Sequence, residues 1–151
     1  MASQQRGTAN ADNFSLGIAG ATYLGLGGDD VYVLDPNLVP AGSNISIFDA
    51  DGNNTIRLPD GVDIASSTIA TGPTGSTLRL VLTNGTEITV GGAEAFSFDV
   101  GGDTGGNGAI TQTLDELATD TLGSSVPNLG EEPVNGGPVE IGIPEVSVSV
   151  N

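Results

Sequence analysis

A short glycine-rich stretch carries the pattern in this chain that points most directly to a defined chemistry. It runs Leu-Gly-Leu-Gly-Gly-Asp-Asp-Val-Tyr-Val-Leu from Leu24 to Leu34. Counted from Gly25, it reads as a nine-residue unit with Asp30 in sixth place and Tyr32 in eighth place. Tight turns need glycine where the backbone angles are unusual, and hard cations need carboxylate and carbonyl oxygens. The unit therefore predicts a turn that offers oxygen ligands, followed by a side chain that points into a core.

The nine-residue period extends beyond this unit. Phe14, Tyr23 and Tyr32 follow one another at intervals of nine residues, and Asp12 and Asp30 are eighteen residues apart. In a parallel β-roll built from such repeats, each unit forms half a coil. Asp12 would then lie directly above Asp30, and one calcium ion could bridge the two turns. The same spacing places Phe14 and Tyr32 in one sheet and Tyr23 in the other.

A third, weaker copy follows at residues 51–58. Asn54 stands in the ligand place and Ile56 in the apolar place of this copy. Asn54 lies twenty-four residues beyond Asp30, which is one full coil plus an insertion of six residues. The Pro-rich segment 36–42 fits that insertion, so the sequence predicts at least three stacked turns.

These motifs resemble the haemolysin-type (RTX) calcium-binding repeat proteins, which are secreted bacterial proteins and modules. The resemblance covers about residues 7–61 and rests mainly on residues 25–33. It implies a calcium-binding β-roll in which turn carbonyls and Asp or Asn side chains hold the ion. The candidate ligands are Gly7, Ala9, Asp12, Gly25, Gly27, Asp29, Asp30, Asp51 and Asn54. The alternative is a β-solenoid or sandwich in which the Asp and Asn side chains only shape turns.

Composition and charge limit the functional classes. The chain has 19 acidic and 3 basic residues and a formal net charge of −16. Such a charge disfavours nucleic acid and anionic membranes and favours divalent cations. Cysteine and histidine are absent, so disulfides and zinc, iron or copper sites are not expected, and neither is a Ser-His or Cys-His nucleophile. We therefore expect Ca²⁺ as the ligand and no enzymatic activity.

The expected fold is mainly all-β. A parallel β-roll is followed by an antiparallel β-meander around the Asn84-Gly85 turn signal, then by one short helix and a C-terminal extended strand. Thr113 is expected to cap the helix and Gly123 to end it. The expected segments are a disordered N-terminus (1–6), the calcium β-roll (7–61), the meander that caps it (62–100), a Gly-rich linker and short helix (101–123), a Pro/Gly linker (124–138) and the C-terminal strand (139–151).

The C-terminal segment and the termini suggest where the protein works. Apolar residues alternate with polar ones on both sides of Pro144-Glu145, so residues 139–150 are expected to add as a strand to a sheet edge of another copy. The expectation is an extracellular calcium-binding structural protein that forms a matrix filament or surface-layer polymer. No N-terminal signal peptide and no membrane span are expected, and the resemblance implies the type I secretion route.

Several alternatives remain open for the C-terminal segment and for the whole chain. The segment could fold back on its own domain, or it could serve as a secretion signal. The chain could be a monomeric calcium-binding adhesion module, the folding cap of a larger RTX-type protein, or a structural protein of a phage or virion.

Overall fold

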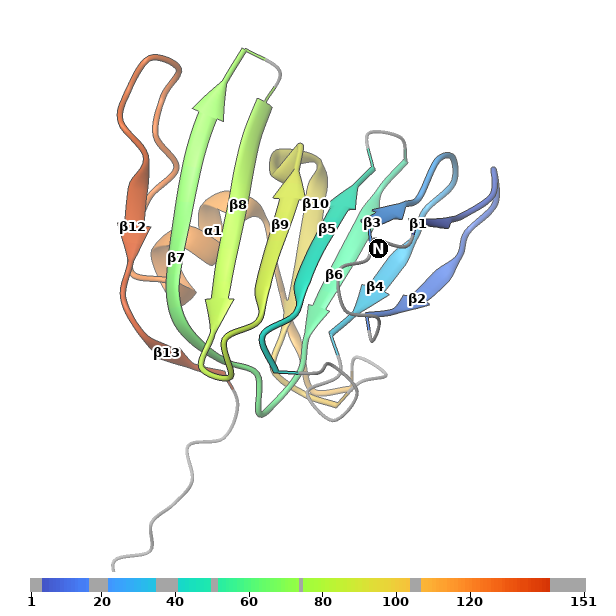
Figure 1. The fold of residues 1–151 in the computed structure, drawn as a ribbon, viewed down its shortest axis with the longest axis horizontal. Helices are drawn as coiled ribbons and strands as arrows, with labels where there is room; N and C mark the ends of the chain where they lie inside the picture. Colours follow the sequence, from blue (N-terminus) through green and yellow to red (C-terminus); the bar gives the residue numbers. More distant parts are fainter. Residues whose placement is uncertain are drawn as a thin grey trace, which may run out of the picture.

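Two β-sheets face each other and enclose one hydrophobic core, as the computed structural model shows (Figure 1). It describes residues 4–16, 22–34, 41–49, 52–73, 75–103 and 107–141. One sheet has eight strands and the other has five, and the helical elements are short. The mainly all-β class predicted from the sequence is confirmed.

Each sheet combines parallel and antiparallel strands. The eight-stranded sheet contains, in spatial order, β1 (Gln4–Arg6), β3 (Thr22–Leu24), β5 (Asn44–Phe48), β9 (Glu87–Gly91), β8 (Gly75–Leu82), β7 (Asp63–Gly72) and β12 (Val134–Gly136), and β13 (Val139–Glu140) also pairs with β7. The five-stranded sheet contains β11 (Ile110–Gln112), β10 (Phe96–Val100), β6 (Asn54–Leu58), β4 (Val31–Val33) and β2 (Asn13–Ser15).

The N-terminal strands alternate between the two sheets and form coils with the predicted register. Phe14 pairs with Tyr32, and Tyr32 pairs with Ile56, all in the five-stranded sheet. Tyr23 lies in the opposite sheet, next to Ile47. The rings of Phe14 and Tyr32 are stacked, with centroids 5.0 Å apart and planes 10° apart. The nine-residue half-coil, the shared sheet of Phe14 and Tyr32, and the larger step to Ile56 are therefore confirmed.

The meander expected over residues 62–100 differs in its last strand. β7, β8 and β9 are antiparallel neighbours, and the turn at Asn84 and Gly85 joins β8 to β9 as expected. β10, however, lies in the other sheet, parallel to β6, while β9 lies parallel to β5. Gly92, with a φ of 66°, and the 3-10 turn η1 (Ala93–Ala95) carry the chain across. β9 and β10 thus form one more coil, and the β7–β8 hairpin is an insertion within the coils.

The N-terminus also differs from the expectation, because residues 4–6 are not disordered. They form β1, which pairs in parallel with β3, so that Gln5 lies beside Tyr23. The physical reason is the period itself, since Gln5 stands one coil before Tyr23. Residues 1–3 lie outside the described ranges.

The segment after β10, expected to begin with a Gly-rich linker, instead returns as β11, which pairs antiparallel with β10. Residues 101–103 and 107–109 lie between β10 and β11, and the Asp103 N–H donates to the Asn107 carbonyl at 3.0 Å. The predicted short helix starts directly after Thr113, its expected cap residue. It comprises α1 (Leu114–Glu116) and the π-helical turn η2 (Leu117–Thr121). Thr113 and Glu116 form a complete capping box, the arrangement that satisfies the free N–H groups of a helix start.

The Pro/Gly linker expected over 124–138 contains a strand, because β12 pairs antiparallel with β7. Gly136 is buried there, and a side chain at that position would collide with the Leu122 carbonyl and with Ser67 Oγ. β13 also pairs with β7 of the same chain, and the Ile141 carbonyl accepts the Gly61 N–H at 2.9 Å. The rest of the expected C-terminal strand, residues 142–151, lies outside the described part.

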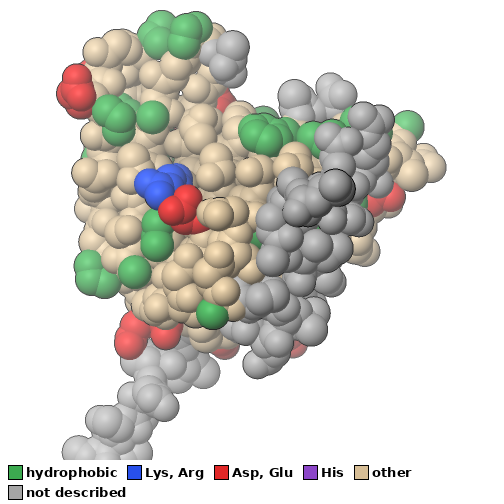
Figure 2. All heavy atoms as spheres, viewed as in Figure 1, with side chains coloured by type: hydrophobic (Ala, Val, Ile, Leu, Met, Phe, Trp, Pro, Cys, Tyr) green, Lys and Arg blue, Asp and Glu red, His purple; other side chains and the backbone are tan. Residues whose placement is uncertain are grey.

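The outer face of the eight-stranded sheet is largely polar (Figure 2). Figure 2 shows one basic group beside an acidic one on this face, where Arg79 on β8 pairs with Glu87 on β9. Among the described residues, no helix is long and apolar enough to cross a membrane.

Candidate cation site in the stacked turns

Three turns lie one above another where the chain passes from the eight-stranded to the five-stranded sheet. Turn one spans residues 7–12, turn two residues 25–30 and turn three residues 49–54, of which 50 and 51 are outside the described part. We call this stack the turn column. The Asp12 N–H donates to Asp30 Oδ1 at 2.9 Å, and the Asp30 N–H donates to Asn54 Oδ1 at 2.9 Å. The predicted stacking of Asp12 on Asp30 is confirmed. Asn54 extends the stack, and we call these two hydrogen bonds the ladder.

These hydrogen bonds assign one definite role to the ladder. Each Asp or Asn oxygen accepts the N–H of the equivalent residue one coil earlier, which satisfies a backbone donor that the parallel strands leave unpaired. That is the turn-shaping role that the sequence left open as an alternative. Each carboxylate has a second oxygen, however, so the structural role does not use up its capacity to bind a cation.

Asp12 uses its second oxygen within its own turn. Asp12 Oδ2 accepts the Thr8 N–H at 2.7 Å, and Thr8 Oγ1 lies 3.2 Å from both carboxylate oxygens. Asp12 is partly exposed and belongs to the first coil that the structure describes. Its carboxylate is therefore both solvated and hydrogen-bonded.

Asp30 has very different surroundings. Its side chain is only 1% exposed, and Oδ2 has no hydrogen-bond partner among the described residues. Burial, and next to it the neighbouring Asp49 carboxyl group, raises the pKa of Asp30 from 3.8 to about 7. An ionised carboxylate in such a position is costly unless a proton or a cation compensates it.

Three oxygen atoms converge over Gly25, in turn two. The Tyr32 hydroxyl donates to Asp49 Oδ2 at 2.7 Å in a buried contact. A Cβ atom on Gly25 would lie 1.8 Å from Asp49 Oδ2, 2.2 Å from the Tyr32 hydroxyl and 2.5 Å from Asp30 Oδ2. Burial, followed by the contact with Asp49, raises the pKa of Tyr32, so its hydroxyl stays protonated. Glycine is required here because these oxygens occupy the space of a side chain.

The other predicted ligands divide between two layers of the turn column. In the layer between turns one and two, a Cβ on Gly7 would lie 2.7 Å from both Asp12 Oδ2 and the Gly25 carbonyl oxygen. Gly27 packs on Ala9, since a Cβ on Gly27 would be 3.2 Å from the Ala9 Cα.

The layer between turns two and three contains Asp30 and the Asn54 amide. Asp29 lies on its exposed side, where Asp29 Oδ1 accepts the Asn53 N–H at 2.8 Å. Asp51 lies outside the described residues.

Asp49 is the site residue that the sequence reasoning missed. It directly follows β5, is 5% exposed, and stands where turns one and two have Gly7 and Gly25. Aligning turn three on the other two would have revealed a carboxylate in a glycine place.

The oxygen atoms over Gly25 are of a kind that hard cations bind. Asp30 and Asp49 supply carboxylate oxygens, and Tyr32 supplies a neutral oxygen, all of the hard type that calcium prefers. The described ranges contain no group of three or more Asp, Glu, His or Cys that could hold a metal. Any cation here would therefore depend on two carboxylates together with neutral oxygens.

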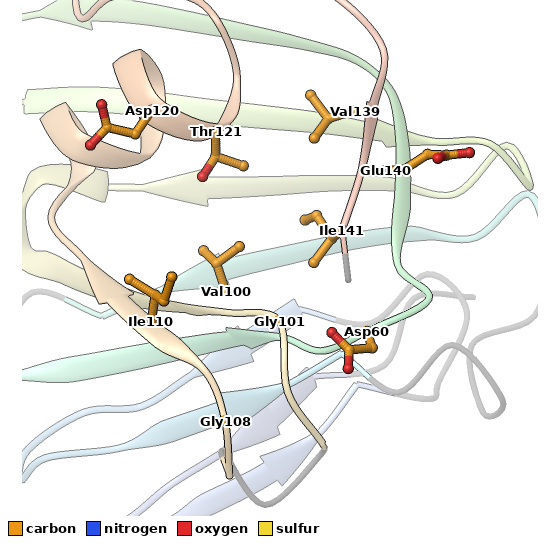
Figure 3. Close-up of a pocket in the computed structure, with 10 residues that line it drawn as sticks. All are labelled: Asp60, Val100, Gly101, Gly108, Ile110, Asp120, Thr121, Val139, Glu140 and Ile141. Carbon is orange, nitrogen blue, oxygen red and sulfur yellow. The ribbon is translucent and has the colours of Figure 1, made fainter. Parts of the chain in front are cut away.

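A separate hollow of about 530 Å³ lies near the end of the described chain (Figure 3). The side chains of Val100, Val139 and Ile141 face one another across it, between β10 and β13. Asp60 lies at its edge, where it accepts the Gly102 N–H at 2.9 Å. The lining of the hollow is mixed, because the acidic residues Asp60, Asp120 and Glu140 line it together with the aliphatic side chains.

The chain matches no family model, no curated protein and no solved structure. Its function has to be inferred from its own residues and their geometry.

Proposed function

We propose that this protein is a calcium-stabilised structural module that works outside the cell, of the haemolysin-type repeat class. The observation that carries the proposal is Asp30 in the turn column, a buried carboxyl group whose second oxygen has no hydrogen-bond donor. A calcium ion would compensate that charge and tie neighbouring turns together.

The charge distribution supports a metal ion as the compensating charge. The chain has a net charge of −16 and contains no lysine. Both arginine side chains that the structure describes pair away from the turn column. Arg57 Nε lies 3.5 Å from an Asp99 oxygen, and Arg79 pairs with Glu87. No described basic side chain therefore forms an ion pair with Asp30.

The calcium concentration outside cells suits a site of this kind. Extracellular calcium modules have dissociation constants of about 10⁻⁴–10⁻³ M. The chain has no cysteine, so a metal ion would supply the cross-link that disulfides provide in many small secreted domains. The resemblance to secreted repeat proteins supports the same location.

A melting experiment tests the calcium proposal. Binding to the folded state alone stabilises by about 2.7 kcal/mol at a hundredfold excess over the dissociation constant. For a chain of 151 residues, this corresponds to a melting temperature roughly 5–10 °C higher in calcium than in chelator. Magnesium at the same ionic strength serves as the control. Equal melting temperatures in calcium and in chelator would rule the proposal out.

Self-assembly through the C-terminus is a second proposal. Val139, Glu140 and Ile141 pair with or contact their own chain, so a connecting strand would comprise residues 142–150. The aliphatic part of the hollow, to which Val100, Val139 and Ile141 contribute, offers a surface for the alternating valines of such a strand.

Light scattering in calcium, for the full chain and for a chain ending at Ile141, tests the assembly proposal. The expected result is that the full chain polymerises and the shortened chain does not. Polymers of equal size from both chains would refute a connecting role of the C-terminus, and monomers from both would favour a stand-alone module or cap.

A further inference from the structure

Asp49 occupies a place in the turn column that the other two turns leave to glycine. The strand register pairs Arg6 with Leu24 and Leu24 with Phe48. The residues that follow these three, namely Gly7, Gly25 and Asp49, are therefore equivalent. Turn three adds a carboxylate at a position where the nine-residue motif has none.

The carboxylate of Asp49 points into the molecule. Asp49 is 5% exposed, its Oδ2 accepts the Tyr32 hydroxyl, and the same oxygen lies over Gly25. The Oδ2 atom of Asp30, which has no donor, faces the same space over Gly25. Two carboxylates from consecutive turns thus meet on the inner side of the turn column.

We infer that Asp30 and Asp49 together bind one calcium ion between turns two and three, with the Tyr32 hydroxyl oxygen as a neutral neighbour. This inference rests on the proposed calcium-binding function and specifies its site. It differs from the site expected from the repeat, in which Asp12 and Asp30 share the ion between turns one and two.

The contrast between the two layers supports this assignment. Asp12 already accepts hydrogen bonds from Thr8, and the ring that approaches Gly7 is Phe14, which has no oxygen. In the layer between turns two and three, the equivalent positions hold one more carboxylate, that of Asp49, and the hydroxyl group of Tyr32. Oxygen atoms that could bind a cation are therefore more numerous between turns two and three, and one of them, Asp30 Oδ2, accepts no hydrogen bond among the described residues.

Calcium suits this buried place better than magnesium. Calcium accepts irregular sets of oxygen ligands, whereas magnesium requires near-octahedral geometry and usually keeps several waters. The carboxylates of Asp30 and Asp49 are almost fully buried, which leaves little access for a hydrated ion. The site should thus discriminate between these two cations.

Three Asp→Asn variants compared by calcium titration test the inference. Asp49→Asn should weaken calcium binding at least about tenfold, the lower range of the loss caused by removing even an outer-shell partner of a metal. Asp12→Asn and the exposed control Asp115→Asn should keep the wild-type affinity within about twofold, since neither removes a proposed ligand.

Terbium luminescence provides a second measurement that does not depend on the Asp49 variant folding. Terbium(III) replaces calcium at oxygen sites, and a nearby tyrosine sensitises its emission. Tyr32→Phe keeps the buried ring and should abolish most of the sensitised emission, while Tyr23→Phe should keep it.

The possible failures are distinguishable. Weak binding in Asp12→Asn together with wild-type binding in Asp49→Asn would overturn this site and leave the calcium function intact. Sensitised emission that depends on Tyr23 instead of Tyr32 would overturn it as well. A wild-type protein that binds no calcium would refute both the site and the proposed function.

Discussion

The first and second coils have the same motif but different chemistry. In the first coil, Asp12 is partly exposed and its carboxylate accepts a hydrogen bond from Thr8, and the ring next to Gly7 is that of Phe14. In the second coil, Asp30 is 1% exposed and lies beside Asp49 and the hydroxyl group of Tyr32. Equivalent positions in a repeat therefore differ because one coil lies at the end of the stack and the other inside it.

This difference separates the features that the repeat itself determines from those that residues in neighbouring coils determine. The repeat sets the backbone ladder, since both Asp30 and Asn54 accept an N–H from the preceding coil. The depth of the coil and the residue across the layer decide whether a carboxylate is solvated or isolated. The cation binding proposed above would thus be a property of a pair of coils.

Removing the aromatic ring from each of the two coils should give the largest difference in the free energy of unfolding. Tyr32 is fully buried, so Tyr32→Ala should destabilise the fold by roughly 3–5 kcal/mol. Phe14 is only partly buried, so Phe14→Ala should cost about 1–2 kcal/mol. Urea unfolding of both variants in chelator measures these costs. Equal costs would mean that both rings are equally well packed and would contradict the contrast between the coils.

The pH dependence of stability should separate Asp30 from Asp12 in calcium-free protein. The folded-state pKa of Asp30, about 7, lies above its ordinary value of 3.8, so the folded state holds the proton more tightly than the unfolded state does. Its stabilising contribution is complete below about pH 4 and declines as the pH rises to about 7, by at most about 4 kcal/mol.

Unfolding free energies measured from pH 4 to pH 8 check this prediction. Asp30→Asn should flatten the decline, and Asp12→Asn should leave it unchanged. If the decline persists in Asp30→Asn, another group is responsible for it.

Replacing Leu26 with glycine should raise the stability of the fold slightly, whereas Tyr32→Ala and Phe14→Ala lower it. It stands where the repeat usually has glycine, and the structure holds it at a φ of 65° with its side chain 45% exposed. A left-handed conformation costs an ordinary residue about 1–2 kcal/mol, while glycine loses about 0.5–1 kcal/mol through its greater freedom when unfolded. Leu26→Gly should therefore stabilise by up to about 1 kcal/mol, as a thermal melt would show. Destabilisation would mean that the Leu26 side chain contributes to packing.

The spacing of residues was sufficient to predict the coils. Intervals of nine, eighteen and twenty-four residues predicted the stacking of Asp12, Asp30 and Asn54 and the sheet to which Tyr23 belongs. This worked because a parallel coil converts a constant sequence interval into a constant position in space. Long-range partners outside that period were not predictable in the same way.

Two features that the sequence did not predict, the sheet to which β10 belongs and the role of Asp49, have the same physical origin. The meander was expected to extend over residues 62–100, but the sequence of its last strand does not say which sheet that strand joins, and β10 pairs with β6. Asp49 follows a strand, as many turn residues do. Its role depends on the absence of a side chain at Gly25, one coil away. Both depend on contacts between coils that no local pattern contains.

The hydrogen-bond ladder also makes each coil depend on the next one. In each rung the N–H belongs to the earlier coil and the acceptor to the later one, from Asp12 to Asp30 and from Asp30 to Asn54. A coil is thus complete only after the next coil in the chain is in place, and stacked repeats gain most of their stability from such neighbours. A chain that emerges N-terminus first would keep its early coils open until the later ones arrive. The stability of each early coil would then depend on the coil that follows it.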